Sequence, residues 1–147
     1  MSVTLKLIFD ENFGVPLVEA FGQLLKVVSE FSIEIESLPR MLKTGLKDAD
    51  WVPRIKQDDS AWIVITQDRR RRQGGDKLAS VCREHGVTHI ALSGRLGQEK
   101  QLNKVRAILA VWEEFGDVGS SPPGTMFCLR YTPSRSVVLE RRPLSAA

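Results

Sequence analysis

The sequence predicts an α/β fold: a three-layer α/β/α sandwich around a mainly parallel central sheet, with a C-terminal β-hairpin. Short apolar runs at 4–9 and 62–67 have the length of buried strands, and each stops at an aspartate. Segments with apolar residues at helical spacing lie between the strand-like runs. A turn-rich stretch at 132–135 separates two further strand-like runs, which is typical of a hairpin.

The first strand, residues 4–9, ends at Asp10. A helix at about 14–26 follows, with its apolar residues on one face. Isoleucine and glutamate alternate within 27–37, which predicts a second strand. Residues 38–47 contain a proline and a glycine and are expected to form a loop.

The next helix begins at Asp48 or Asp50, because the carboxylate of an aspartate accepts the free amide protons of a first turn. If Asp50 is the cap, Pro53 falls in the first turn, where its missing N–H costs nothing. If Asp48 is the cap, the proline falls later and perturbs the helix. The sequence leaves both starts open.

The clearest strand, residues 62–67, ends at Asp68. A helix at about 76–85 follows and is expected to end at Gly86 in a left-handed cap. Residues 89–92 form another short apolar strand. The two histidines beside this glycine are expected at a helix end and in a loop, without a metal role.

A glycine-containing loop leads to the longest predicted helix, at about 98–115. Residues 116–124 are rich in Gly, Ser and Pro and predict a loop, and residues 125–142 predict the C-terminal hairpin. The hairpin could extend the sheet, cover an edge strand or mediate formation of a homodimer. The apolar stripe of the long helix consists of Leu102, Val105, Ile108, Leu109, Trp112 and Phe115.

Composition indicates one soluble domain over residues 1–147. The hydrophobic fraction is 42% and the charged fraction 27%, which are ordinary values for a globular protein. Cys82 and Cys128 lack metal-ligand spacing and are expected to be free core residues in a reducing compartment. No run of about 18 apolar residues is present, so no membrane span is predicted. We therefore expect a cytoplasmic protein.

The net charge of +3 and the sequence pI of about 9.1 permit an acidic partner. The excess is concentrated in four consecutive arginines, Arg69, Arg70, Arg71 and Arg72. Arginine forks suit phosphate oxygens, so this run is a candidate RNA-binding segment. A solvated loop or a docking surface for an acidic protein segment fits the same residues.

Three separated aspartates carry the functional prediction. Asp10 and Asp68 each follow a strand, and Asp48 opens a helix, so all three can reach the carboxyl edge of the sheet. Carboxylates gathered there repel one another unless a cation lies between them, and hard oxygen ligands favour Mg²⁺ or Mn²⁺. Such an ion can activate water against a phosphodiester. Taken singly, an aspartate after a strand is as often a turn former or a helix cap.

Three segments carry a resemblance to a known family. Residues 5–13, 45–51 and 62–68 resemble, in this order, the opening Asp-Glu-Asn strand, the acidic helix start and the strand with Thr-x-Asp of PIN-like domains of the VapC toxin kind. Together with the helices that follow, the resemblance covers about residues 4–115.

The resemblance implies a metal-dependent endoribonuclease that is the toxin of a type II toxin–antitoxin module, with RNA as substrate and an antitoxin protein as partner. It implies that Asp10, Asp48 and Asp68 hold Mg²⁺ or Mn²⁺, with Glu11 and Asp50 as auxiliary groups.

The chain departs from the family pattern at one position. Many relatives carry an acidic residue two positions after the third aspartate, where this chain has Arg70. The alternative is therefore a catalytically weak or inactive module that binds RNA or a protein. Thr66, which precedes Asp68 by two residues, is a candidate to orient a carboxylate or to contact substrate, and a structural strand threonine is the plainer interpretation.

A phosphoacceptor domain of the receiver kind is a third hypothesis that suits this fold class. It would use Asp10 and Glu11 with a later aspartate and a lysine near a strand end. Lys77 and Lys100 fit that lysine position poorly.

Overall fold

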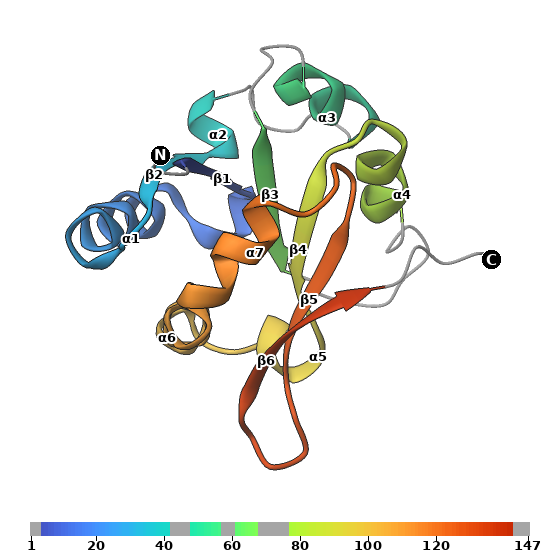
Figure 1. Ribbon diagram of the computed structural model, residues 1–147. Coiled ribbons are helices and arrows are strands. Elements are labelled where there is room, and N and C mark those ends of the chain that lie inside the picture. Colours follow the sequence, from blue (N-terminus) through green and yellow to red (C-terminus); the bar gives the residue numbers. More distant parts are fainter. Residues whose placement is uncertain (1–3, 42–47, 57–60, 68–76, 143–147) are drawn as a thin grey trace.

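The structure is a computed structural model that describes residues 4–41, 48–56, 61–67 and 77–142 (Figure 1). It contains one six-stranded sheet in the order β2-β1-β3-β4-β5-β6. The strands β1 to β5 pair with one another in parallel, and β6 pairs antiparallel with β5. The strands are β1 (Thr4–Phe9), β2 (Ser32–Ser37), β3 (Trp62–Gln67), β4 (Thr88–Leu92), β5 (Met126–Tyr131) and β6 (Val137–Arg142).

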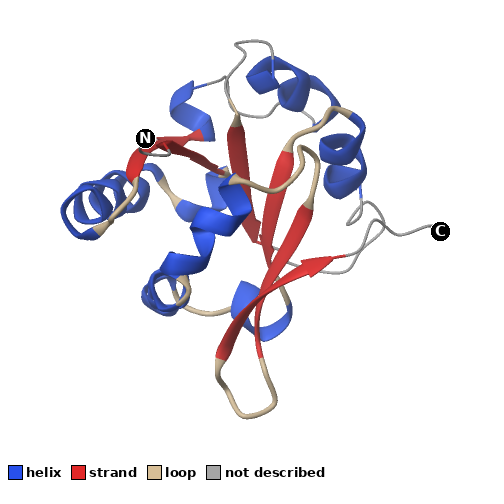
Figure 2. Ribbon diagram, in the orientation of Figure 1, coloured by secondary structure: helices blue, strands red, loops and turns tan. Residues whose placement is uncertain are grey.

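Helices cover both faces of this sheet, as the ribbon coloured by secondary structure shows (Figure 2). The helices are η1 (Glu11–Phe13), α1 (Val15–Val28), α2 (Leu38–Met41), α3 (Asp48–Lys56), α4 (Lys77–Glu84), α5 (Gly94–Gly97), α6 (Gln101–Ala110), η2 (Trp112–Glu114) and α7 (Phe115–Gly119), of which η1 and η2 are short 3-10 helices. The predicted three-layer α/β/α arrangement is confirmed, together with the C-terminal hairpin.

Two apolar cores lie on opposite faces of the sheet. On one face, α1 and the helices α5 to α7 pack on alternate residues of the central strands, with Phe9, Ile65 and Phe115 essentially inaccessible to solvent. On the other face, α2, α3 and α4 pack against Ile8 and Val64. Side chains alternate between the two faces along a strand, so continuous apolar strands supply both cores.

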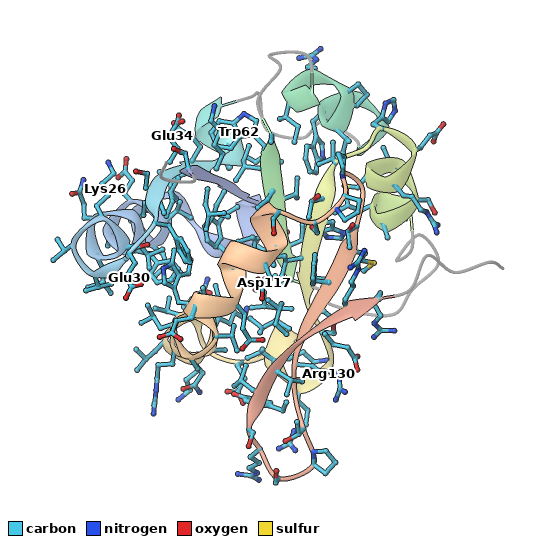
Figure 3. All side chains as sticks on the ribbon, viewed as in Figure 1. Lys26, Glu30, Glu34, Trp62, Asp117 and Arg130 are labelled. Carbon is cyan, nitrogen blue, oxygen red and sulfur yellow. The ribbon has the colours of Figure 1, made fainter. Side chains whose placement is uncertain are left out.

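The last strands are part of the same sheet. β5 pairs with β4 in parallel, and its residues Phe127 and Leu129 enter the larger core. β6 lies at the edge, and the ion pair between Arg130 and Glu140 (3.1 Å) joins the two strands at an exposed position (Figure 3). Because β5 supplies buried side chains, the hairpin is part of the apolar core and not a surface extension.

The helix predicted at 98–115 is instead divided into α6, η2 and α7. The division falls at Val111, whose backbone leaves the helical conformation with φ −114° and ψ 18°. The apolar stripe predicted there is also wrong at one position, since Leu102 is 67% exposed. Lys104 is buried in its place, along with Ala107 and Ile108, so α6 is rotated relative to the predicted stripe.

Two predicted loops contain short helices. Residues 94–97 form α5, whose Leu96 is fully buried, so packing stabilises a turn that two glycines disfavour. Residues 38–41 form α2, in which Pro39 stands in the first turn, where proline is tolerated. In both cases the tertiary contacts outweigh the local preference for a loop.

The structure settles the start of the third α-helix. α3 begins at Asp48 and includes Asp50 in its first turn, so Pro53 lies inside the helix. The helix persists because Trp51, Val52 and Ile55 are at most 3% exposed and anchor it to the sheet. Burial of three large apolar side chains offsets the backbone hydrogen bond that proline cannot make.

Several local predictions are confirmed. Gly86 follows α4 with φ 69°, the left-handed conformation expected of a glycine cap. Trp112 of the predicted apolar stripe is a core residue, and Cys82 and Cys128 are buried and form no disulfide. In the part of the chain that the structure describes, no helix combines the length and apolar character needed to cross a bilayer.

Replacing Leu129 by alanine should lower the free energy of unfolding by about 3 kcal/mol, because alanine leaves a cavity at a fully buried position. The matched control is Leu102→Ala, for which we expect a change within about 0.5 kcal/mol because the side chain is mostly exposed. Urea unfolding measures both. Equal effects at the two positions would contradict the integration of β5 into the core.

Candidate functional site

The sheet has a reversal point between β1 and β3, where the order in which successive strands are added to the sheet changes direction. From β1 the chain passes through α1 to β2 on one side, then returns past β1 to pair β3 on its other side. α1 covers one face of the sheet, whereas α4, which follows β3, covers the other. The connections therefore diverge at the carboxyl ends of β1 and β3, the position where open α/β sheets bind ligands.

Asp10 lies at this point and its carboxylate is held in a defined direction. Its backbone N–H donates to the carbonyl oxygen of Ile65 (3.0 Å), so the pairing of β1 with β3 continues through this residue. Asn12 donates from its backbone N–H to Asp10 Oδ1 (3.0 Å) and from Nδ2 to Oδ2 (3.3 Å). Phe13 closes the turn by donating to the Asp10 carbonyl oxygen (3.2 Å). The two donors of Asn12 therefore fix the direction of the Asp10 carboxylate.

The end of α3 lies at the amino edge of the sheet. Ile55, near the end of α3, lines a cavity together with Thr4 and Trp62, which begin β1 and β3. Asp48 and Asp50 stand in the first turn of α3, at the opposite end of the helix from this cavity. The side chains of these two aspartates lie outside the described part of the structure.

The other predicted site residues lie wholly or partly outside the described part of the structure. β3 ends at Gln67, and Asp68 together with the arginines 69–72 lies outside the described residues. Glu11 belongs to η1, directly after Asp10, and its side chain is likewise not described. The metal-binding and RNA-binding roles of these residues stay predictions.

A buried lysine that the sequence did not single out lies at the carboxyl edge. Lys104 of α6 is 5% exposed, and its Nζ donates to Oε1 of Gln67, the last residue of β3. The ammonium group also lies 5.9 Å from the ring centre of Phe13. One turn earlier in α6, Gln101 Nε2 donates to the Asn12 carbonyl oxygen (3.2 Å). α6 thus contacts the segments that end both strands of the candidate site.

Thr66 and His89 form a buried polar pair on the α3–α4 face. Thr66 is 5% exposed, and its Oγ1 lies 2.8 Å from His89 Nε2. This contact agrees with the structural interpretation of the threonine, and burial leaves its hydroxyl little access to an RNA strand. His89 lies inside β4, so the strand predicted at 89–92 is confirmed and the loop placement of this histidine is wrong.

Burial lowers the pKa of His89 to about 4, because the charged imidazolium would lose its hydration. Its Nδ1 is buried without a hydrogen-bond partner among the described residues. His89 is therefore neutral near pH 7 and acts as a hydrogen-bonding core residue.

The cavity at the opposite, amino edge has a volume of about 160 Å³. Besides Thr4 and Trp62, its lining includes Thr88 and Ser121. No carboxylate lines it among the residues described. It therefore lacks the hard oxygen ligands that the candidate metal chemistry requires.

Among residues whose side chains are described, no three His, Cys, Asp or Glu groups come together in a way that could hold a metal ion. Glu30, Glu34 and Asp117, labelled in Figure 3, lie on separate parts of the surface. The side chains of Asp48 and Asp68 are not among these residues, so the predicted ligand set stays a prediction.

A family model described as a PIN-like domain matches residues 5–94, which is more than half of the chain. The chain belongs to the PIN-like domain family. The match runs from β1 to β4 and includes all three predicted ligands, Asp10, Asp48 and Asp68. PIN-like domains have a nuclease-type fold. No curated protein and no solved structure gives a significant match.

The PIN-like match ends before α6, so the segment that contributes Lys104 and the strands β5 and β6 lies beyond it. Sequence periodicity offered no signal for Lys104, because a lysine in a helix is ordinarily on the solvent side. Asn12 was part of the Asp-Glu-Asn motif, and only the structure shows that both its donors reach Asp10.

Acid should destabilise the protein through His89. Its folded-state pKa is lower than the ordinary value of 6.5, so its contribution is fully present above pH 6.5 and is lost as the pH falls toward 4. The expected loss approaches about 3 kcal/mol over this interval. His89→Gln should flatten the dependence between pH 7 and 4.5, measured by urea unfolding.

The matched control is His85→Gln, at the partly exposed histidine after α4, which should keep the dependence of the parent. Parallel curves for the parent and His89→Gln would show that His89 is not the group responsible.

Proposed function

We propose that this PIN-like domain is a metal-dependent endoribonuclease and the toxin component of a type II toxin–antitoxin system. The observation that carries the proposal is the position of Asp10 at the reversal point of the sheet, with its carboxylate oriented by Asn12 beside the end of β3. A nuclease-type fold with an oriented carboxylate at its ligand-binding edge fits phosphodiester hydrolysis.

The donor chemistry of the edge fits Mg²⁺ or Mn²⁺. Asp10 offers carboxylate oxygens at a partly exposed position, and Asp48 and Asp68 are the further ligands in the proposal. A bound ion of this kind would act as a Lewis acid that activates water and stabilises charge on the phosphate. Glu11 and Asp50 are auxiliary carboxylates in the same proposal.

In this proposal, each group of residues has a separate role. The aspartates hold the ion, and Asn12 fixes the direction in which Asp10 presents its oxygens. The run from Arg69 to Arg72 directly follows Asp68 and would bind phosphates of the RNA on either side of the cut. The net charge of +3 suits an acidic antitoxin segment as the inhibitory partner.

A non-catalytic module that binds RNA or a protein partner is the second candidate. The observation that favours it is Arg70, which stands where many relatives carry an acidic residue. Arg70 adds affinity for phosphate and takes the place of a carboxylate metal ligand. This candidate function therefore predicts RNA binding without cleavage.

The deciding experiment is cleavage of a mixed RNA panel by the purified protein with Mn²⁺, with Mg²⁺ and with chelator. Asp10→Asn and Asp68→Asn should each lower the cleavage rate by roughly 100-fold or more, because a neutral amide is a poorer ligand for a hard cation. Asp117→Asn is the matched control, because this exposed aspartate of α7 adjoins Val118, which lines the cavity at the amino edge.

Cleavage that persists in chelator, or in both aspartate variants, would rule out the metal mechanism. Metal-independent RNA binding by the parent without any cleavage would favour the second candidate.

Asn12→Ala should reduce cleavage about tenfold while the fold is retained, because Asp10 loses the contact that Asn12 Nδ2 donates to its Oδ2. The control is Asn103→Ala, which removes a comparable hydrogen bond, to Glu99 Oε1 (2.8 Å), within α6. Equal rates in the parent and Asn12→Ala would show that the orientation of Asp10 does not depend on this side chain.

A further inference from the structure

α6 buries a lysine and exposes a leucine, the reverse of what apolar burial favours. Lys104 is 5% exposed, whereas Leu102 of the same helix is 67% exposed. The inward face of α6 otherwise consists of apolar residues such as Ala107 and Ile108. A buried ammonium group loses its hydration, so this placement requires compensation from negative charge nearby.

The surroundings of Lys104 belong to the two strand ends of the candidate site. Its Nζ donates to Gln67 Oε1, and the next residue in the chain is Asp68. On the other side, the ring of Phe13 lies 5.9 Å from the ammonium group, in the turn whose first carboxylate is Asp10. The cation is thus held between the segments that supply two of the three carboxylates.

The lysine is not needed to dock α6 on this edge. Gln101 already joins α6 to the turn through its bond to the Asn12 carbonyl oxygen. A methionine or leucine at position 104 would extend the core formed by Ala107 and Ile108 at no electrostatic cost. What an apolar side chain could not supply is a fixed positive charge.

We propose that Lys104 is a built-in counter-ion of the carboxylate site: its ammonium group offsets the repulsion among the carboxylates and thereby sets how tightly the site binds its divalent cation. This inference rests on the proposed metal site of Asp10, Asp48 and Asp68. Lys104 is a positioning residue, acting through the carboxylates. Two effects of opposite sign follow, because the same charge stabilises the metal-free protein and repels the incoming ion.

The test compares Mn²⁺ affinity, measured by calorimetry, with thermal unfolding in chelator and in saturating Mn²⁺. Lys104→Met removes the charge and keeps the length of the side chain, and Lys104→Gln removes the charge but keeps a donor for Gln67. Lys100→Met is the matched control, an exposed lysine one turn earlier. Asp10→Asn serves as the reference for a damaged metal site.

Both Lys104 variants should bind Mn²⁺ about tenfold more tightly than the parent, because each removes a unit positive charge that repels the divalent ion. In chelator their Tm should fall by about 3–6 °C, because the carboxylates are left uncompensated. Mn²⁺ should then raise the Tm of these variants by more than it raises that of the parent. Lys100→Met should match the parent in all three measurements.

Unchanged or weaker Mn²⁺ binding in both Lys104 variants would overturn the inference, and an equal loss of Tm with and without Mn²⁺ would identify a packing role instead. If Lys104→Met does not fold, Lys104→Gln decides. Failure of the proposed function looks different: the parent would bind no Mn²⁺, or Asp10→Asn would bind it equally well. The inference would then fall with the metal site.

Discussion

The pairing of β1 with β3 is the constraint on which the candidate site depends. It brings together two strands that are separated by more than fifty residues in the sequence, and it continues through the hydrogen bond from the Asp10 N–H to the Ile65 carbonyl oxygen. The backbone of Asp10 is hydrogen-bonded to β3, and Asn12 fixes the direction of its carboxylate through two hydrogen bonds. The helices that follow the two strands leave on opposite faces, so the edge between them stays open for a ligand.

Charge and apolar packing compete at this edge, and in α6 the charged Lys104 is buried while Leu102 is exposed. Carboxylates that gather to bind a cation destabilise the protein in the absence of that cation. A buried lysine costs desolvation, and close negative charge offsets that cost. Exposing Leu102 and burying Lys104 sacrifices apolar burial, which is the kind of local conflict that proteins tolerate at functional sites.

The fold extends beyond the segment that defines its family. The PIN-like match ends at residue 94, yet Phe115, Phe127 and Leu129 fill the larger core from beyond that point. The same C-terminal segment provides α6 and its contact with the Asp10 turn. The PIN-like segment and the later segments therefore share one apolar core.

The sequence by itself determined the strands and the residues that end them. Buried parallel strands are continuous apolar runs, so β1 and β3 were predictable to within a residue, along with Asp10 and Asp68 directly after them. Tertiary structure alone decided the inward face of α6, the break at Val111 and the burial of His89 against Thr66. The physical reason is that periodicity reports local preference. Whether Lys104 or Leu102 is buried depends instead on Gln67 and Phe13, which lie far away in the chain and meet α6 only when the sheet has formed.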